Sequence, residues 1–167
     1  MAERGCIKDG HFQNLEVEGL VSLAMRPMKT TIMFNNFTAA AGNTYLVQDT
    51  SGCTVVLPAP TTGDRIKIVF GGTDYLDLGN SGHKIHTDAP TTLFNGYALL
   101  DDILFPSSPL MLPKVFAPLA TDHIFTLDGA GTGYSGVVEL IGTDSNRWYM
   151  EAVIHSRGGV YTPFSST

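Results

Sequence analysis

Short β-strand signals separated by turn residues run through most of this chain. From about residue 30 onward, segments rich in β-branched and aromatic residues recur roughly every ten to fifteen residues. Residues 65–70 alternate apolar and polar side chains, which is the pattern of a strand with one buried face. Glycine, proline, aspartate and asparagine lie between these segments and favour tight turns. The sequence offers no long segment with a helical period, although residues 93–101 leave room for one helical turn.

About nine such strands predict an all-β fold, either a β-sandwich or a jelly-roll-like barrel of about 8–10 short antiparallel strands. The chain of 167 residues fits one compact domain with an extended terminus. Residues 1–28 are predicted to form an N-terminal arm, polar at first and ending in an attachment strand with alternating side chains at 14–23. Residues 29–167 then form the sandwich domain.

A proline-rich segment at residues 101–120 interrupts the strand pattern. Its prolines at positions 106, 109, 113 and 118 disfavour a regular helix and a central strand. We therefore expect a long insertion loop that either contacts a partner or caps one end of the sandwich. The candidate contact residues of this loop are Leu104, Phe105, Leu110, Leu112, Val115 and Phe116.

The charge of the chain is low, with 16% charged residues and a net charge of −6. A weakly charged polar surface suits contact with other subunits, because buried charge is costly. The ten basic residues are scattered, so the sequence offers no concentrated basic face for nucleic acid. The chain shows no secretory signal and no apolar stretch near the ~20 residues of a membrane helix. We expect synthesis in the cytoplasm, with neither nucleic acid nor membrane as a partner.

The sequence contains two cysteines, too few for a disulfide framework, and they lack the spacing of a metal knuckle. Cys6 lies in the predicted arm, and Cys53 is expected to pack as a small apolar side chain. His83 and His86 are three residues apart, so on a strand they point to opposite faces. We predict no metal and no cofactor. One of these histidines could instead line a symmetry axis, where three copies bind an ion or respond to pH.

Sequence patterns that resemble catalytic motifs lack the setting that their chemistry requires. The glycines at 129–133 do not precede a helix, as a phosphate loop must, so we predict a β-turn. Ser135 stands in a segment one residue short of a nucleophile elbow. Asp74, Asp77 and Asn80 lack the regular spacing and bidentate glutamate of a calcium loop. We therefore predict a non-enzymatic protein with no catalytic residues, in which Trp148 anchors the core or a subunit interface.

Four stretches carry a resemblance to a known class of protein. Residues 44–60 contain a strand, a short turn and a valine-x-leucine-proline strand, and residues 63–68 follow with a glycine-x-arginine strand. Residues 138–149 end in asparagine-x-tryptophan-tyrosine, and residues 9–19 form a leader. Together these stretches are similar to structural β-domains of tailed-phage virions.

The resemblance implies a trimer-forming β-domain that is attached to the virion through its N-terminal arm. The short length favours a capsid decoration or cement protein, whose partner is the major capsid protein or another virion protein. A short tail or head fibre that binds a host receptor or glycan is the alternative. A host-encoded β-sandwich binding module and an enzyme are the remaining classes.

The predicted arm carries apolar side chains that we expect to contact the virion, although a disordered tail is the alternative. These arm residues are Ile7, Phe12, Leu15, Val17 and Leu20. The apolar side chains predicted to fill the core are Val21, Leu23, Val47 and Val55.

Overall fold

The structure is a computed structural model that describes residues 29–48, 52–71, 82–102, 113–127, 134–156 and 162–167. These residues form twelve β-strands and no helix, so they include no helix that could span a membrane. The all-β fold predicted from the sequence is confirmed. The strands are β1 (Lys29–Met33), β2 (Phe37–Thr38), β3 (Asn43–Val47), β4 (Thr54–Val56), β5 (Arg65–Phe70), β6 (His83–His86), β7 (Leu93–Asp102), β8 (Lys114–Phe116), β9 (Ile124–Leu127), β10 (Tyr134–Asp144), β11 (Arg147–Ser156) and β12 (Phe164–Ser165).

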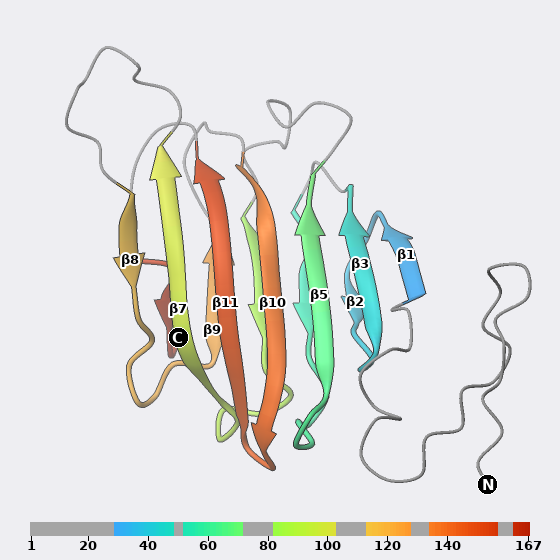
Figure 1. Cartoon of the computed structure of the whole chain (residues 1–167), viewed down its shortest axis with the longest axis vertical. Coiled ribbons are helices and arrows are strands. Elements are labelled where there is room, and N and C mark those ends of the chain that lie inside the picture. The colour runs from blue at the N-terminus through green and yellow to red at the C-terminus, as the bar shows by residue number, and fades with distance from the viewer. Residues whose placement is uncertain (1–28, 49–51, 72–81, 103–112, 128–133, 157–161) are drawn as a thin grey trace, which may run out of the picture.

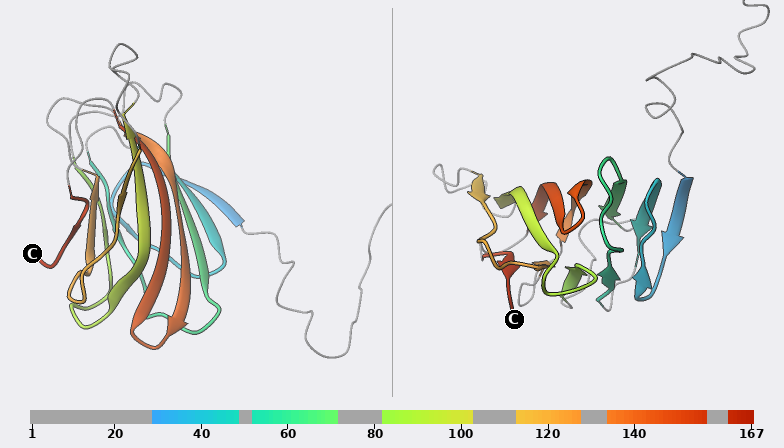
Figure 2. Two further views of the ribbon diagram at one scale, coloured as in Figure 1. Left: turned by 60° about the vertical axis from the view of Figure 1, so that its left-hand side comes forward. Right: turned by 90° about the horizontal axis from the view of Figure 1, so that it is seen from below.

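The strands form two sheets that pack face to face as a sandwich (Figures 1 and 2). The larger sheet has seven strands in the order β1-β3-β5-β10-β11-β7-β8. The smaller sheet has five strands in the order β12-β9-β6-β4-β2. Seen along the strands in the right-hand view of Figure 2, the two sheets form two layers.

The first six strands wind between the two sheets. Strands β1, β3 and β5 lie side by side and parallel in the larger sheet, while β2, β4 and β6 do the same in the smaller one. A chain that crosses to the opposite sheet and returns re-enters the first sheet in the same direction, so neighbouring strands become parallel. The prediction of antiparallel strands throughout was therefore wrong, because side-chain periodicity does not reveal which sheet the next strand joins.

The second half of the chain mixes both directions. Strands β10 and β11 form a long antiparallel hairpin, β10 also pairs antiparallel with β5, and β11 pairs in parallel with β7. Twelve strands exceed the predicted number because β2, β7, β8 and β12 were not predicted. Three of these are edge strands of two or three residues, which carry little sequence signal.

The predicted insertion loop at 101–120 is partly β-structure. Strand β7 continues to Asp102, and β8 pairs antiparallel with it at the edge of the larger sheet. Pro113 precedes β8 and Pro118 follows it, so neither proline removes a hydrogen bond from within this edge strand. The prediction of a continuous loop was wrong for these strand residues, while 103–112 lie outside the described residues.

The core lies between the inner faces of the two sheets. Its predicted members Val47 and Val55 are fully buried, and so is Cys53, as expected for a small apolar side chain. Val21 and Leu23 lie outside the described residues. One inner row crosses the whole smaller sheet, and cross-strand pairing aligns its five apolar residues, Phe37, Val55, Ile85, Phe125 and Phe164.

A glycine in β7 allows this strand to approach β11 closely. Gly96 pairs with Met150 and has a φ of 104°, a backbone conformation that other residues rarely adopt. A Cβ atom at this position would overlap the backbone oxygen of Met150. Gly96 is therefore required by both conformation and space.

We predict that Gly96→Ala lowers the free energy of unfolding by about 2 kcal/mol or more, because strained φ and backbone overlap both oppose the new side chain. Urea denaturation followed by tryptophan fluorescence measures this change. Gly71→Ala is the matched control, since a Cβ there meets no atom within 4 Å. Equal stability of the two variants would contradict the prediction.

Candidate interaction surface

Exposed apolar side chains gather on one face of the sandwich. Six large hydrophobic residues are exposed in the described part of the chain, and four of them lie on the outer face of the larger sheet. These four are Ile32, Tyr97, Val115 and Val153. The other two are Phe34, directly after β1, and Leu119, between β8 and β9. These four residues share one face, from the edge strand β1 to the opposite edge strand β8, which makes this face the candidate interaction surface.

The sequence predictions found one of these four residues. Val115 was a predicted contact residue and is 65% exposed, whereas its neighbour Phe116 packs against the core. Ile32, Tyr97 and Val153 were missed, because alternation along a strand shows that two faces differ but not which face a partner covers. Four predicted loop contacts and all five arm contacts lie outside the described residues: Leu104, Phe105, Leu110 and Leu112, and Ile7, Phe12, Leu15, Val17 and Leu20.

Charged and aromatic residues share the same outer face. Lys67 and Glu139 form an exposed ion pair with a nitrogen–oxygen distance of 2.8 Å. The Tyr149 hydroxyl donates to the Glu151 carboxylate at 3.3 Å. Partial desolvation and the negative charge of Glu151 raise the pKa of Tyr149. The raised pKa is consistent with a protonated Tyr149 hydroxyl that donates to Glu151.

The described stretches behind the predicted phage resemblance contact one another near the β10–β11 turn, whereas residues 9–19 lie outside the described residues. Trp148 is fully buried, and its indole nitrogen donates to the backbone oxygen of Pro58 at 3.1 Å. Leu57, in the valine-x-leucine-proline segment, is also fully buried. The prediction that Trp148 anchors the core is confirmed. These motif residues therefore connect the two sheets.

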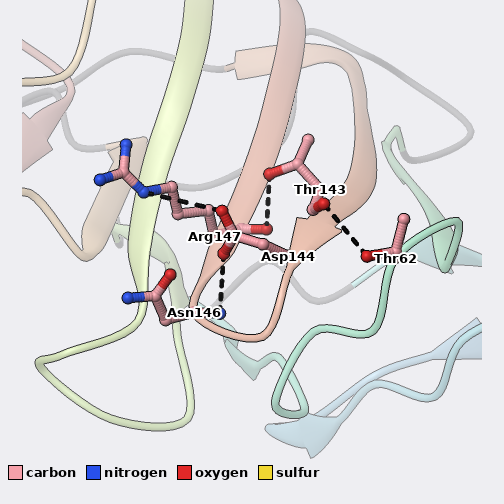
Figure 3. A network of polar contacts seen from close by, with 5 residues as sticks. All are labelled: Thr62, Thr143, Asp144, Asn146 and Arg147. Atoms are coloured by element: carbon pink, nitrogen blue, oxygen red, sulfur yellow. Dashed lines mark hydrogen bonds and ion pairs between the residues drawn. The ribbon is translucent and has the colours of Figure 1, made fainter.

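A network of polar contacts joins the turn before β5 to the β10–β11 hairpin (Figure 3). The Thr62 hydroxyl donates to the backbone oxygen of Thr143 at 3.1 Å. Asp144 accepts a hydrogen bond from the backbone nitrogen of Asn146 at 2.9 Å and lies 3.9 Å from the Arg147 guanidinium. These exposed side chains satisfy one another and the backbone of the turns. Their arrangement holds the hairpin in place and offers no activated nucleophile or base.

The histidines separate as the strand pattern predicts. His83 points into the core, where its Nδ1 accepts the backbone N–H of Cys53 at 3.1 Å. His86 lies on the outer face of the smaller sheet, where burial, then Lys84, then His123 lower its pKa. Within the described ranges, no three His, Cys, Asp or Glu side chains are placed to hold a metal ion.

No protein-family model and no curated protein sequence matches this chain. Its function has to be inferred from its own fold and surface.

We predict that His86 makes the fold less stable as the pH falls below about 6.5, the ordinary histidine pKa. The lowered pKa means that the unfolded chain binds this proton more readily than the folded chain does. The contribution of His86 to stability is fully present above that pH, and it is lost at lower pH as the unfolded state takes up the proton. Melting temperatures at about pH 7.5 and pH 5.5 should differ less for His86→Gln than for the unchanged protein; an equal loss in both would exclude this role.

Proposed function

We propose that this chain is a non-enzymatic structural protein of a phage virion, a trimeric capsid decoration or cement protein attached through its N-terminal arm. The observation that carries the proposal is the outer face of the larger sheet, where apolar side chains remain exposed. A partner that covers this face would bury apolar surface at about 25 cal/mol per Å². The arm would attach the protein to the major capsid protein or to another virion protein.

The use of polar groups in the fold supports a structural role. The polar side chains of Thr62 and Asp144 form hydrogen bonds with backbone groups of the β10–β11 hairpin. In the interior, the side chains that bond to backbone groups are those of Trp148 and His83. Each of these contacts stabilises the sandwich. The motifs behind the phage resemblance likewise serve the packing of the two sheets, as expected for a family defined by its scaffold.

A trimer with three arms would explain strong attachment without a large site on any one subunit. When one arm binds, the other two are held near their own sites at a high effective concentration. Three weak contacts then act as one strong contact. The low charge of the chain, 16% of its residues, suits packing against a protein shell.

We predict that gold-labelled antibodies against this protein decorate the heads of virions produced by the genome that encodes it. Labelling restricted to the tail or neck would favour a fibre. Virions without label would overturn the proposal. Electron microscopy of the labelled particles, with virions of an unrelated phage as control, distinguishes these outcomes.

The arm has its own test. We predict that removing residues 1–20 abolishes binding to purified empty shells while the sandwich stays folded, because the described core begins after this segment. Co-sedimentation with shells measures binding, and the fluorescence of the buried Trp148 reports folding. Retained binding of the folded, shortened chain would exclude the arm as the anchor.

One cluster favours the second candidate function, a short fibre that binds a host receptor or glycan. On the outer face, Tyr149 pairs with Asn95 and Glu151 pairs with Tyr97 across β11 and β7. Aromatic rings beside amide and carboxylate groups can stack on sugar rings and bind hydroxyls. A fibre predicts adsorption of the purified protein to host cells and at least tenfold weaker adsorption for Tyr97→Ala. No adsorption of the unchanged protein would exclude this function.

A further inference from the structure

A row of aliphatic side chains crosses the entire outer face of the larger sheet, with one residue from each strand. Cross-strand pairing aligns each residue with the next, from the edge strand β1 to the opposite edge strand β8. We call this row the aliphatic stripe. In spatial order its members are Ile32, Leu46, Val69, Val137, Val153, Leu99 and Val115.

The stripe faces away from the core. Residues next to its members along the strands, such as Val138 and Ile154, are fully buried, so alternation turns the stripe outward. Its members Ile32, Val153 and Val115 are 52%, 43% and 65% exposed. Figure 1 looks onto this face, and no described strand lies in front of it. In the single chain, three members of the stripe are therefore exposed to solvent, and the other four are half-buried.

The smaller sheet shows that such a row is not a general property of these strands. The corresponding outer row of that sheet alternates between polar and apolar side chains. Its members in spatial order are Ser165, Ile124, His86, Val56 and Thr38. A partner that buries a continuous apolar row would therefore contact the larger sheet and not the smaller one.

The stripe is long and narrow. Seven strands with spacings of about 4.8 Å make it about 29 Å long. Over its central strands the stripe is one side chain wide, because Lys67, Glu139 and Glu151 flank it on one side and Ser135 and His155 on the other; on β7 the exposed Tyr97 lies beside it. Burying a broad area of this face against a flat partner would also bury these charges, at a high cost.

We propose that three copies of this chain bury their stripes against one another around a three-fold axis that runs parallel to the stripe. Three sheets arranged as the sides of a triangle lie nearest their common axis along their stripes, and neighbouring sheets meet at the three corners. Apolar side chains would then meet at the axis, while the charged flanking rows face one another at the corners. A narrow stripe with polar flanks fits this arrangement better than a flat face-to-face dimer.

The flanking rows are complementary in this arrangement. Three-fold rotation places one flank of each sheet beside the opposite flank of the next. Glu151 and His155 both lie on β11, two residues to either side of Val153, so they are at the same height along the axis. Each of the three corners would therefore bring the Glu151 carboxylate of one copy near the His155 ring of its neighbour.

The sheet face supplies most of the area that a stable assembly needs. Six residues along each strand cover about 20 Å, which with the length of the stripe gives roughly 600 Å² of sheet face per copy, the corner rows included. Stable interfaces bury about 800 Å² per partner. The inference rests on the proposed function in taking three copies, and it adds the surface through which they associate.

The test is the mass of the full chain in solution, measured by light scattering coupled to gel filtration. We expect three times the chain mass of 17.9 kDa for the unchanged protein and the single-chain mass for Val153→Lys. Val56→Lys, the same change on the outer face of the smaller sheet, should remain trimeric. Val115→Lys, at the exposed edge of the stripe, is the second variant and should shift dissociation to at least tenfold higher concentration. Fluorescence of Trp148 checks that each variant is folded.

A charge exchange tests the corner contact. Glu151→Lys should dissociate the trimer at concentrations where the unchanged protein is intact, and adding His155→Glu should restore it. Failure of this rescue would overturn the pairing of the two flanks.

The outcomes separate the inference from the proposed function. A trimer that survives in folded Val153→Lys would overturn the stripe as the interface and leave the virion role standing. A dimer of the unchanged protein would overturn the three-fold arrangement. A monomer at high concentration would remove both the stripe contact and the trimeric part of the proposed function, while labelling of virions tests the virion role independently.

Discussion

The packing of two inner faces against each other is the constraint on which the rest of this structure depends. Because side chains alternate along every strand, burying one set of residues between the sheets directs the other set outward. A slip of one residue would exchange the two sets. Trp148, which bonds to Pro58 across the interior, and Gly96, which fits against Met150, help to hold this register. The outer surface is thus determined by the same contacts that form the core.

The winding of the first six strands has consequences for the surface. Each return to the larger sheet adds a parallel strand, and the hairpin β10–β11 then joins this layer to β7 and β8. Strands that are distant in the sequence therefore become neighbours, and their outward residues combine into one surface. The aliphatic stripe draws on seven separate segments between Ile32 and Val153. A surface of this kind is formed by the sheet as a whole, and no local sequence motif encodes it.

The residues that suggested a resemblance to phage virion proteins have structural roles in this fold. Leu57 and Trp148 are buried, and the glycine turn at 61–64 is bonded to the end of the β10–β11 hairpin. These residues hold the scaffold together, while the outer face of the larger sheet carries exposed apolar side chains. The proposed function draws on that face, whose residues can change without disturbing the scaffold.

The sequence by itself determined the all-β class, most of the strands, the burial of Val47, Val55 and Cys53, and the core position of Trp148. These features depend on local alternation and turn residues, which are visible along the chain. The parallel winding, the strand character of 93–102 and the edge strand β8 were decided by the tertiary structure. The same holds for the stripe, because its residues become neighbours through hydrogen bonds between strands far apart in sequence. Alternation specifies that a strand has two faces, but only the pairing of strands decides which side chains share one.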